Sequence, residues 1–188
     1  DLEPDPAPLE WAGRLAELQG TVWLLDQEEG QWQAALRNRA LASGDRLATD
    51  SDGRAELRIG STTIRLGANS ELELLRLDDE AMQFQLHAGS AALRVRSDLE
   101  RKRLHGLAAL ARTGSAVGQG LYSATEGGRT YAALAAAADT MLRHGFDAIV
   151  DATFLRRRDR LEFRQVAAAN AARFAILECH ASPRELRR

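Results

Sequence analysis

Cysteine, proline and aromatic residues are scarce in this chain of 188 residues. Cys179 is the only cysteine, which excludes an internal disulfide and a cysteine-rich zinc site, and we expect it to be buried. Three of the four prolines lie within the first eight residues, so we expect residues 1–12 to form a flexible lead-in. No run of about 18 apolar residues is present, so we expect no transmembrane segment.

The four histidines also lack the close spacing that metal ligands need. The sequence therefore predicts no metal site. Lysine is almost absent, because Lys102 stands alone against 24 arginines. We attribute this bias to codon usage rather than to chemistry.

Charge divides the chain into two unlike halves. Residues 1–97 hold 10 basic and 17 acidic residues, a net charge of −7, whereas residues 98–188 hold 15 basic and 10 acidic residues, a net charge of +5. A swing of this size indicates two structural units.

The first unit has the pattern of antiparallel β-structure. Apolar residues alternate with polar ones in many short segments, of which Ala55, Leu57 and Ile59 form one example. Gly60-Ser61 then fits a two-residue hairpin turn that begins with glycine. Short alternating segments between tight turns predict an antiparallel β-sandwich or barrel-like domain over residues 13–97.

The pattern changes at Ser97. Ser97-Asp-Leu-Glu100 fits a capping box, in which the serine side chain binds the Glu100 amide and the Glu100 carboxylate reaches back. The spacing beyond it predicts a helix over about 130–144 closed by Gly145, a buried strand over 147–152, a helix over 160–173 and a buried strand over 174–179. Together these predict an α+β chain in two parts, whose second part is an incomplete α/β parallel-sheet fragment over 98–188.

Family resemblance can be read for each half. The first carries the segments Gly13-Arg-Leu-Ala-Glu-Leu-Gln-Gly-Thr-Val22, Leu41-Ala-Ser-Gly-Asp-Arg-Leu-Ala-Thr49, Gly53-Arg-Ala-Glu-Leu-Arg-Ile-Gly-Ser61 and Leu86-His-Ala-Gly-Ser-Ala-Ala-Leu-Arg-Val95. Over residues 13–96 this chain of strand-and-turn signatures resembles the FecR-type domain of bacterial envelope proteins. The resemblance implies a periplasmic, non-enzymatic module in envelope signalling or structure.

The second half carries Arg96-Ser-Asp-Leu-Glu-Arg-Lys-Arg-Leu104, Gly120-Leu-Tyr-Ser123, Val150-Asp-Ala-Thr-Phe-Leu155 and Phe174-Ala-Ile-Leu-Glu-Cys-His180. Over residues 96–188 these segments resemble a P-loop kinase-like ATP-binding domain. The resemblance places Asp98 at the phosphoryl acceptor site, as a catalytic residue, and Asp151 at the Walker-B-like position near magnesium, as a cofactor-binding residue. The two family patterns overlap at Leu93-Arg-Val-Arg-Ser-Asp98, which indicates a chimeric junction.

One departure from the kinase pattern limits what it implies. A P-loop needs Gly-x-x-x-x-Gly-Lys-Ser/Thr, and no stretch of the 188 residues has this motif. The resemblance also places the strand before that loop in the middle of the sheet, and this strand is missing too. We therefore expect a poorly packed α/β part that needs no cofactor, with ATP and magnesium relevant only if the kinase-like half is completed.

Each of these residues also has a structural interpretation that involves no catalytic or binding role. Asp151 also fits a turn cap after a strand, and Asp98 fits the first turn of a helix, where the helix dipole favours an acid. Arg156-Arg-Arg-Asp-Arg160 lacks an accompanying aromatic platform in the sequence, so we expect a solvated helix start and no nucleic-acid partner.

The hypothesis favoured by the sequence is a non-enzymatic envelope binding or signalling module with a nonfunctional kinase-like tail. Its partner would be a protein or a cell-envelope component bound by the β-domain. The alternative is a degenerate or split ATP-dependent small-molecule kinase. The first hypothesis implies a periplasmic or envelope location, and the second a cytoplasmic one.

Overall fold

The computed structural model describes residues 13–26, 30–78, 82–107 and 124–178. The lead-in 1–12, Gly120 to Ser123 and Cys179 lie outside these residues. The described elements follow the order β1 (Gly13–Gln19), β2 (Val22–Asp26), β3 (Gln31–Ala34), β4 (Ala40–Leu41), β5 (Arg46–Thr49), β6 (Arg54–Ile59), β7 (Thr62–Leu66), β8 (Glu71–Leu77), β9 (Met82–Ala88), β10 (Ala91–Arg96), α1 (Ser97–Leu104), α2 (Ala124–Arg143), β11 (Asp147–Asp151) and α3 (Arg157–Ala169). In this part of the chain no helix is long and apolar enough to cross a membrane.

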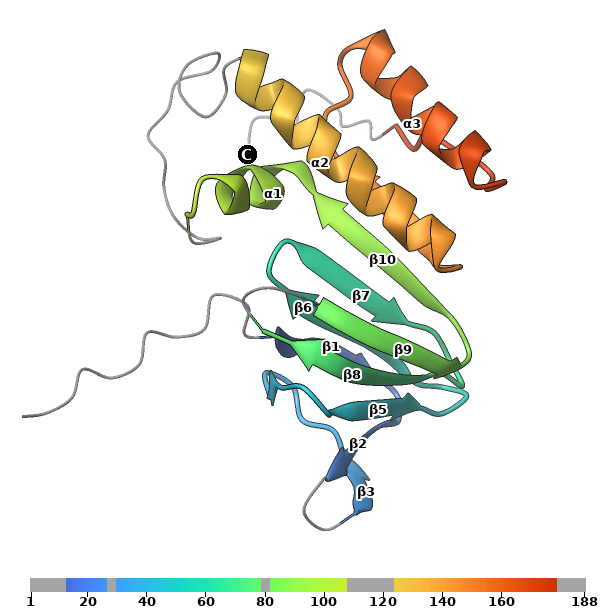
Figure 1. The fold of residues 1–188 in the computed structure, drawn as a ribbon. Coiled ribbons are helices and arrows are strands. Elements are labelled where there is room, and N and C mark those ends of the chain that lie inside the picture. Colours follow the sequence, from blue (N-terminus) through green and yellow to red (C-terminus); the bar gives the residue numbers. More distant parts are fainter. Residues whose placement is uncertain (1–12, 27–29, 79–81, 108–123, 179–188) are drawn as a thin grey trace, which may run out of the picture.

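The described strands form two sheets. One has the order β11-β10-β7-β6-β1-β4 and the other the order β3-β2-β5-β8-β9. Figure 1 shows the two sheets below a layer of helices. The predicted hairpin at Gly60-Ser61 is confirmed, because Ile59 pairs with Thr62 across a two-residue loop and Gly60 has a φ of 54°.

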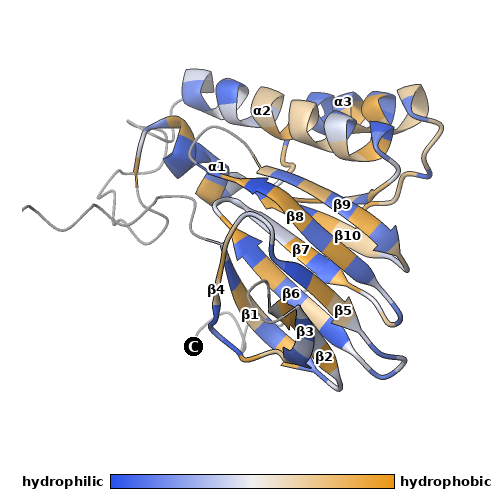
Figure 2. Cartoon of the chain, turned by 60° about the horizontal axis from the view of Figure 1, so that its bottom comes forward, coloured by the Kyte–Doolittle hydropathy of each residue, from blue (hydrophilic) through white to orange (hydrophobic). Residues whose placement is uncertain are grey.

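Alternation along the strands builds the core. In β6 the side chains of Ala55, Leu57 and Ile59 are buried while those between them face outward. The same alternation of hydrophobic and hydrophilic bands runs along neighbouring strands (Figure 2). Because successive strand residues point to opposite faces, each sheet supplies one apolar surface to the core.

The second part of the chain extends the same sheet. β11 pairs in parallel with β10, from Ala92 opposite Asp147 to Arg96 opposite Asp151, while β10 pairs antiparallel with β7 on its other side. The fold is therefore a mixed α+β structure, and its parallel part consists of the pair β10–β11 among the described strands.

The helices α2 and α3 pack on this end of the molecule. Leu134 of α2 is completely buried, and Phe163 of α3 belongs to the same hydrophobic cluster as the sheet residues. Tyr131, Phe154 and Phe163 add edge-to-face ring contacts, with centroids of Phe154 and Phe163 5.1 Å apart. The helix predicted to close at Gly145 is confirmed, and Gly145 has a φ of 81°.

Three local predictions are wrong. The capping box does not form, since the residue before α1 is Arg96, no side chain caps the helix, and the Glu100 carboxylate binds Ser61 and Arg103 instead. The strand over 147–152 forms as β11, but it is an edge strand rather than a buried one, and Ile149 is 40% exposed. Residues 174–178 form no strand, and none of the described strands pairs with them.

Candidate functional site

The candidate site lies where β10 and β11 end. Parallel strands present their carboxyl ends at the same edge of a sheet, and this edge is where open α/β sheets bind ligands. The register pairs Arg96, the last residue of β10, with Asp151, the last residue of β11. α1 begins at the next residue, Ser97, so Asp98 follows immediately.

An arginine links the two acids that the kinase resemblance singles out. Arg96 Nη2 lies 2.9 Å from Asp98 Oδ2, and Arg96 Nε lies 3.9 Å from Asp151 Oδ2. Arg94 forms a second ion pair with Asp151. The structure therefore brings Asp98 and Asp151, 53 positions apart in the sequence, to one arginine at one edge of the sheet.

Both carboxylates remain open to solvent. The side chain of Asp98 is 49% exposed and that of Asp151 is 46% exposed, so a ligand can reach either oxygen pair. Carboxylate oxygens are the protein ligands that magnesium prefers, usually one or two of them together with phosphate oxygens. Asp98 and Asp151 fit that donor set, although the described residues contain no group of three or more potential metal-ligating side chains.

A buried carboxylate fixes the helix that carries Asp98. Glu100 is 7% exposed, and its carboxylate accepts hydrogen bonds from Ser61 Oγ at 2.8 Å and from Arg103 Nη2 at 2.5 Å. Burial works to raise the pKa of Glu100, but the hydrogen bonds from Arg103 and Ser61 and the charge of Arg103 outweigh it and lower that pKa. Glu100 therefore holds a charge that ties α1 to the β6–β7 turn.

The segment after β11 is also held by polar contacts. The backbone amide of Phe154 donates to Tyr131 Oη at 3.0 Å, and Arg160 of α3 donates to the carbonyl oxygens of Phe154 and Leu155. Phe154 has a φ of 45°, a conformation that is uncommon for a bulky residue. These contacts anchor the chain directly after Asp151.

Sequence reasoning missed the residues that position the two acids. Arg94 and Arg96 are alternate polar residues of a strand, which is the usual appearance of a solvent face. Their partner Asp151 becomes a neighbour only through the parallel pairing of β11. The Ser61–Glu100 contact likewise joins residues 39 positions apart.

The model of the AAA domain family matches residues 65–188, about two thirds of the chain. The match supports the kinase-like resemblance of the second half. No curated protein and no solved structure matches the chain.

The family match corrects the favoured functional hypothesis. It begins at Arg65, well inside the stretch that resembles a FecR-type domain, and no comparison supports that resemblance. The prediction of a non-enzymatic envelope or periplasmic signalling module with a nonfunctional tail is therefore wrong, and the findings favour the kinase-like alternative. With most of its length matched, the chain belongs to the AAA domain family.

Proposed function

We propose that the chain is one part of a split ATP-dependent small-molecule kinase, whose phosphate-binding loop comes from a segment outside these 188 residues. The observation that carries this proposal is the position of Asp98 and Asp151. Both lie at the carboxyl ends of a parallel strand pair, within the residues that the AAA domain family matches. That edge is the usual ligand site of such sheets.

Asp98 and Asp151 would have different roles in the reaction. Asp98 would accept the proton from the hydroxyl group of the acceptor as that oxygen bonds to the γ-phosphorus of ATP and the bond to ADP breaks. Asp151 would hold a magnesium ion, which neutralises charge on the phosphate oxygens when it is bound. Arg94 and Arg96 orient the two carboxylates through the ion pairs described above.

These 188 residues alone should not catalyse the transfer. The sequence contains no Gly-x-x-x-x-Gly-Lys-Ser/Thr motif, and the backbone amides and lysine of that loop are what hold the β- and γ-phosphates. Lys102, the only lysine, lies between two arginines within α1. A function that uses ATP would place the protein in the cytoplasm.

Calorimetric titration of magnesium-ATP tests the proposal. The chain would be mixed with a synthetic segment that carries an apolar strand followed by a Gly-rich phosphate-binding sequence. We expect saturable binding in the mixture, weakened about tenfold or more by Asp151→Asn because a magnesium ligand is lost. Asp147→Asn, at the other end of the same strand, serves as the matched control and should leave binding unchanged.

Two results would contradict the proposal. One is a mixture that shows no saturable binding at millimolar nucleotide. The other is equal weakening by Asp147→Asn and Asp151→Asn, because that outcome would reflect the net charge of the strand rather than a site at its carboxyl end.

A further inference from the structure

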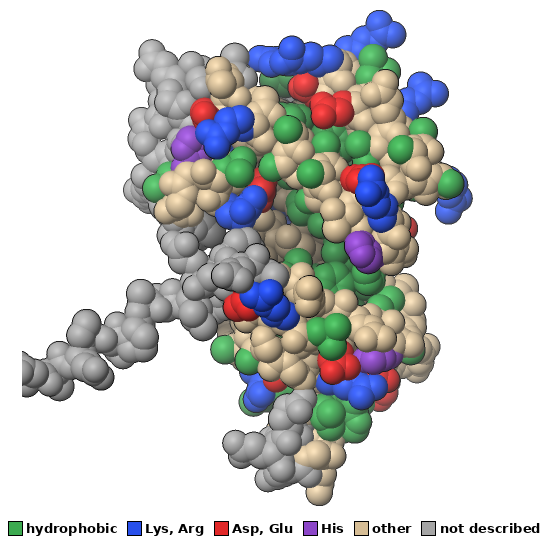
Figure 3. Space-filling model, viewed as in Figure 1, with side chains coloured by type: hydrophobic (Ala, Val, Ile, Leu, Met, Phe, Trp, Pro, Cys, Tyr) green, Lys and Arg blue, Asp and Glu red, His purple; other side chains and the backbone are tan. Residues whose placement is uncertain are grey.

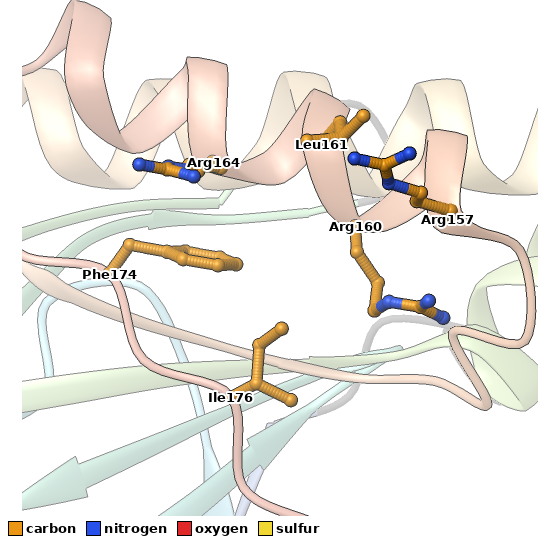
Figure 4. Close-up of a pocket in the computed structure, with 6 residues that line it drawn as sticks. All are labelled: Arg157, Arg160, Leu161, Arg164, Phe174 and Ile176. Carbon is orange, nitrogen blue, oxygen red and sulfur yellow. The ribbon is translucent and has the colours of Figure 1, made fainter.

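A cavity of about 620 Å³ opens beside α3, between one face of the helix and the segment that follows it (Figure 4). Pockets that bind small organic molecules have volumes of about 300 to 1,000 Å³, so this size suits a small ligand. Three arginines and three apolar residues line the cavity: Arg157, Arg160, Arg164, Leu161, Phe174 and Ile176. This lining includes neither Asp98 nor Asp151, so the cavity shares no residue with the two acids at the strand ends.

The arginines of the cavity lie on one face of α3. Positions 157, 160, 161 and 164 follow the spacing i, i+3, i+4 and i+7, which brings side chains to the same side of a helix. The acidic residues of α3, Asp159 and Glu162, fall at other positions around the helix, and neither lines the cavity. Among the described residues the lining therefore holds positive charge and no negative charge. Basic side chains also project from the surface over α2 and α3 (Figure 3).

The opposite wall of the cavity is the segment after α3, and the end of the helix sets its direction. Ala171 has a φ of 53°, a left-handed conformation that ends the helix and turns the chain back. The side-chain amide of Asn170 donates to a carboxylate oxygen of Asp139 on α2 at 2.8 Å, which fixes this turn against the neighbouring helix. Figure 4 shows Phe174 and Ile176 pointing into the space beneath α3. Contacts within the chain thus hold both walls in place before any ligand binds.

Two of the three arginines are available to a ligand. Arg160 is already engaged, because it donates to the carbonyl oxygens of Phe154 and Leu155. The side chains of Arg157 and Arg164 have no hydrogen-bond or ion-pair partner among the described residues. Their two positive charges match a phosphate monoester, which carries a charge of about −1.5 to −2 at pH 7. An anion of that charge is therefore complementary to the cavity.

We infer that the cavity binds a small organic phosphate that carries an aromatic group. Arg157 and Arg164 hold the phosphate, because a guanidinium group can donate two parallel hydrogen bonds to phosphate oxygens. The aromatic group stacks on the ring of Phe174, which is 40% exposed, and covers Ile176, which is 57% exposed. Inorganic phosphate would leave both of these side chains uncovered. The inference goes beyond the proposed function and does not depend on it.

Titration of the 188-residue chain with phenyl phosphate, followed by nuclear magnetic resonance, tests the inference. The readout is the chemical shift of the Ile176 methyl groups and of the Phe174 ring. We expect saturable shifts, with an affinity at least about tenfold higher than that of inorganic phosphate or phenol, because each of these offers only one part of the ligand. Added salt should weaken the binding of phenyl phosphate, since the arginines are open to solvent.

Matched variants show whether the ligand occupies this cavity. Arg157→Gln and Arg164→Gln should each weaken the binding of phenyl phosphate by about tenfold, because each removes a charge-assisted hydrogen bond. Arg158→Gln removes the same charge from α3 at a position outside the lining, where Arg158 pairs with Asp159, and should leave the affinity unchanged. Phe174→Ala should weaken the binding of phenyl phosphate but not that of inorganic phosphate. Circular dichroism would establish that all four variants are folded.

Three results would overturn the inference: no saturable shifts with phenyl phosphate, equally tight binding of inorganic phosphate, or equal weakening by Arg158→Gln and Arg164→Gln. The last would reflect the net charge of α3 rather than a site. Asp151→Asn should leave the binding of phenyl phosphate intact, and a tenfold loss would overturn the inference by placing the phosphate at the strand ends. Because the titration uses neither ATP nor magnesium, this inference and the proposed function can fail separately.

Discussion

The middle of the six-stranded sheet and its β11 end differ in how completely they are covered. At β6 and β7, Leu57, Ile59 and Ile64 are fully buried between the two sheets. At β11 the strand is covered by α2 on one face, and Ile149 on it is 40% exposed. Among the described residues, β6 and β7 are each paired on both sides, whereas β11 has a strand neighbour on one side and carries an exposed apolar side chain. Burial therefore distinguishes a closed core at β6 and β7 from a partly exposed edge at β11 within the same sheet.

The largest effect on the free energy of unfolding should come from removing a side chain from the closed core. Leu57→Ala removes a side chain with no exposed surface and leaves a cavity between the sheets, so we expect a loss of about 3 to 4 kcal/mol in the free energy of unfolding. Leu155→Ala, at an 84% exposed position beside the site, should change it by less than about 0.5 kcal/mol. Urea unfolding of both variants measures the contrast, and similar losses would mean that Leu155 is buried in solution.

A pair of glycines with positive φ sharpens the comparison. A Cβ atom on Gly20, in the sandwich, would lie 2.3 Å from the backbone oxygen of Asp52, whereas one on Gly145, before β11, would meet nothing within 4 Å. Gly20→Ala should cost about 2 to 3 kcal/mol and Gly145→Ala about 1 kcal/mol, because only the first adds a clash with the backbone to the strain of the left-handed conformation. Thermal unfolding distinguishes them, and equal costs would contradict the close packing around Gly20.

The Glu100 contact ties α1 to the β6–β7 turn and should have an intermediate effect. Glu100→Gln removes the charge that binds Arg103 and Ser61, so we expect a loss of about 1 to 2 kcal/mol. The pKa of Glu100 is lowered in the folded protein, so its contribution is present above the ordinary glutamate pKa and is lost as the pH falls through the lowered value. Unfolding measured across the acidic range should thus show a weaker pH dependence in the variant than in the parent chain.

The smallest effect on stability is expected at the site itself. Asp151→Asn breaks ion pairs with two arginines that are 30% and 41% exposed, and such pairs contribute about 0.5 kcal/mol. A loss above about 2 kcal/mol would show that Asp151 is a structural residue. Urea unfolding in parallel with the nucleotide titration separates the two roles.

Much of the fold followed from local patterns in the sequence. The β6–β7 hairpin, α2 with its closing glycine and the existence of β11 came from periodicity and turn residues, which act within a few positions. The Ser97 capping box failed because Glu100 found partners in Ser61 and Arg103, and one of these lies 39 positions away. The strand predicted over 174–179 is absent from its described residues, 174–178, and a strand needs a paired neighbour, which none of the described strands provides.

The site was less accessible to sequence reasoning than the fold. Asp98 and Asp151 came from family resemblance, and their roles and the division of the chain at Ser97 remain predictions. Arg96, which contacts both acids, had no distinguishing signal because its partners depend on the register between β10 and β11. Parallel pairing between strands separated by two helices cannot be read from alternation alone.

Hydrogen exchange of the free chain, resolved to individual amides, tests the contrast between covered and open regions most directly. The account predicts that amides of β6 and β7 exchange slowest, that outward-facing amides of β11 exchange much faster, and that residues 174–177 exchange fastest. Uniformly slow exchange across residues 98–178 would contradict it, because the second region would then be as completely covered as the first.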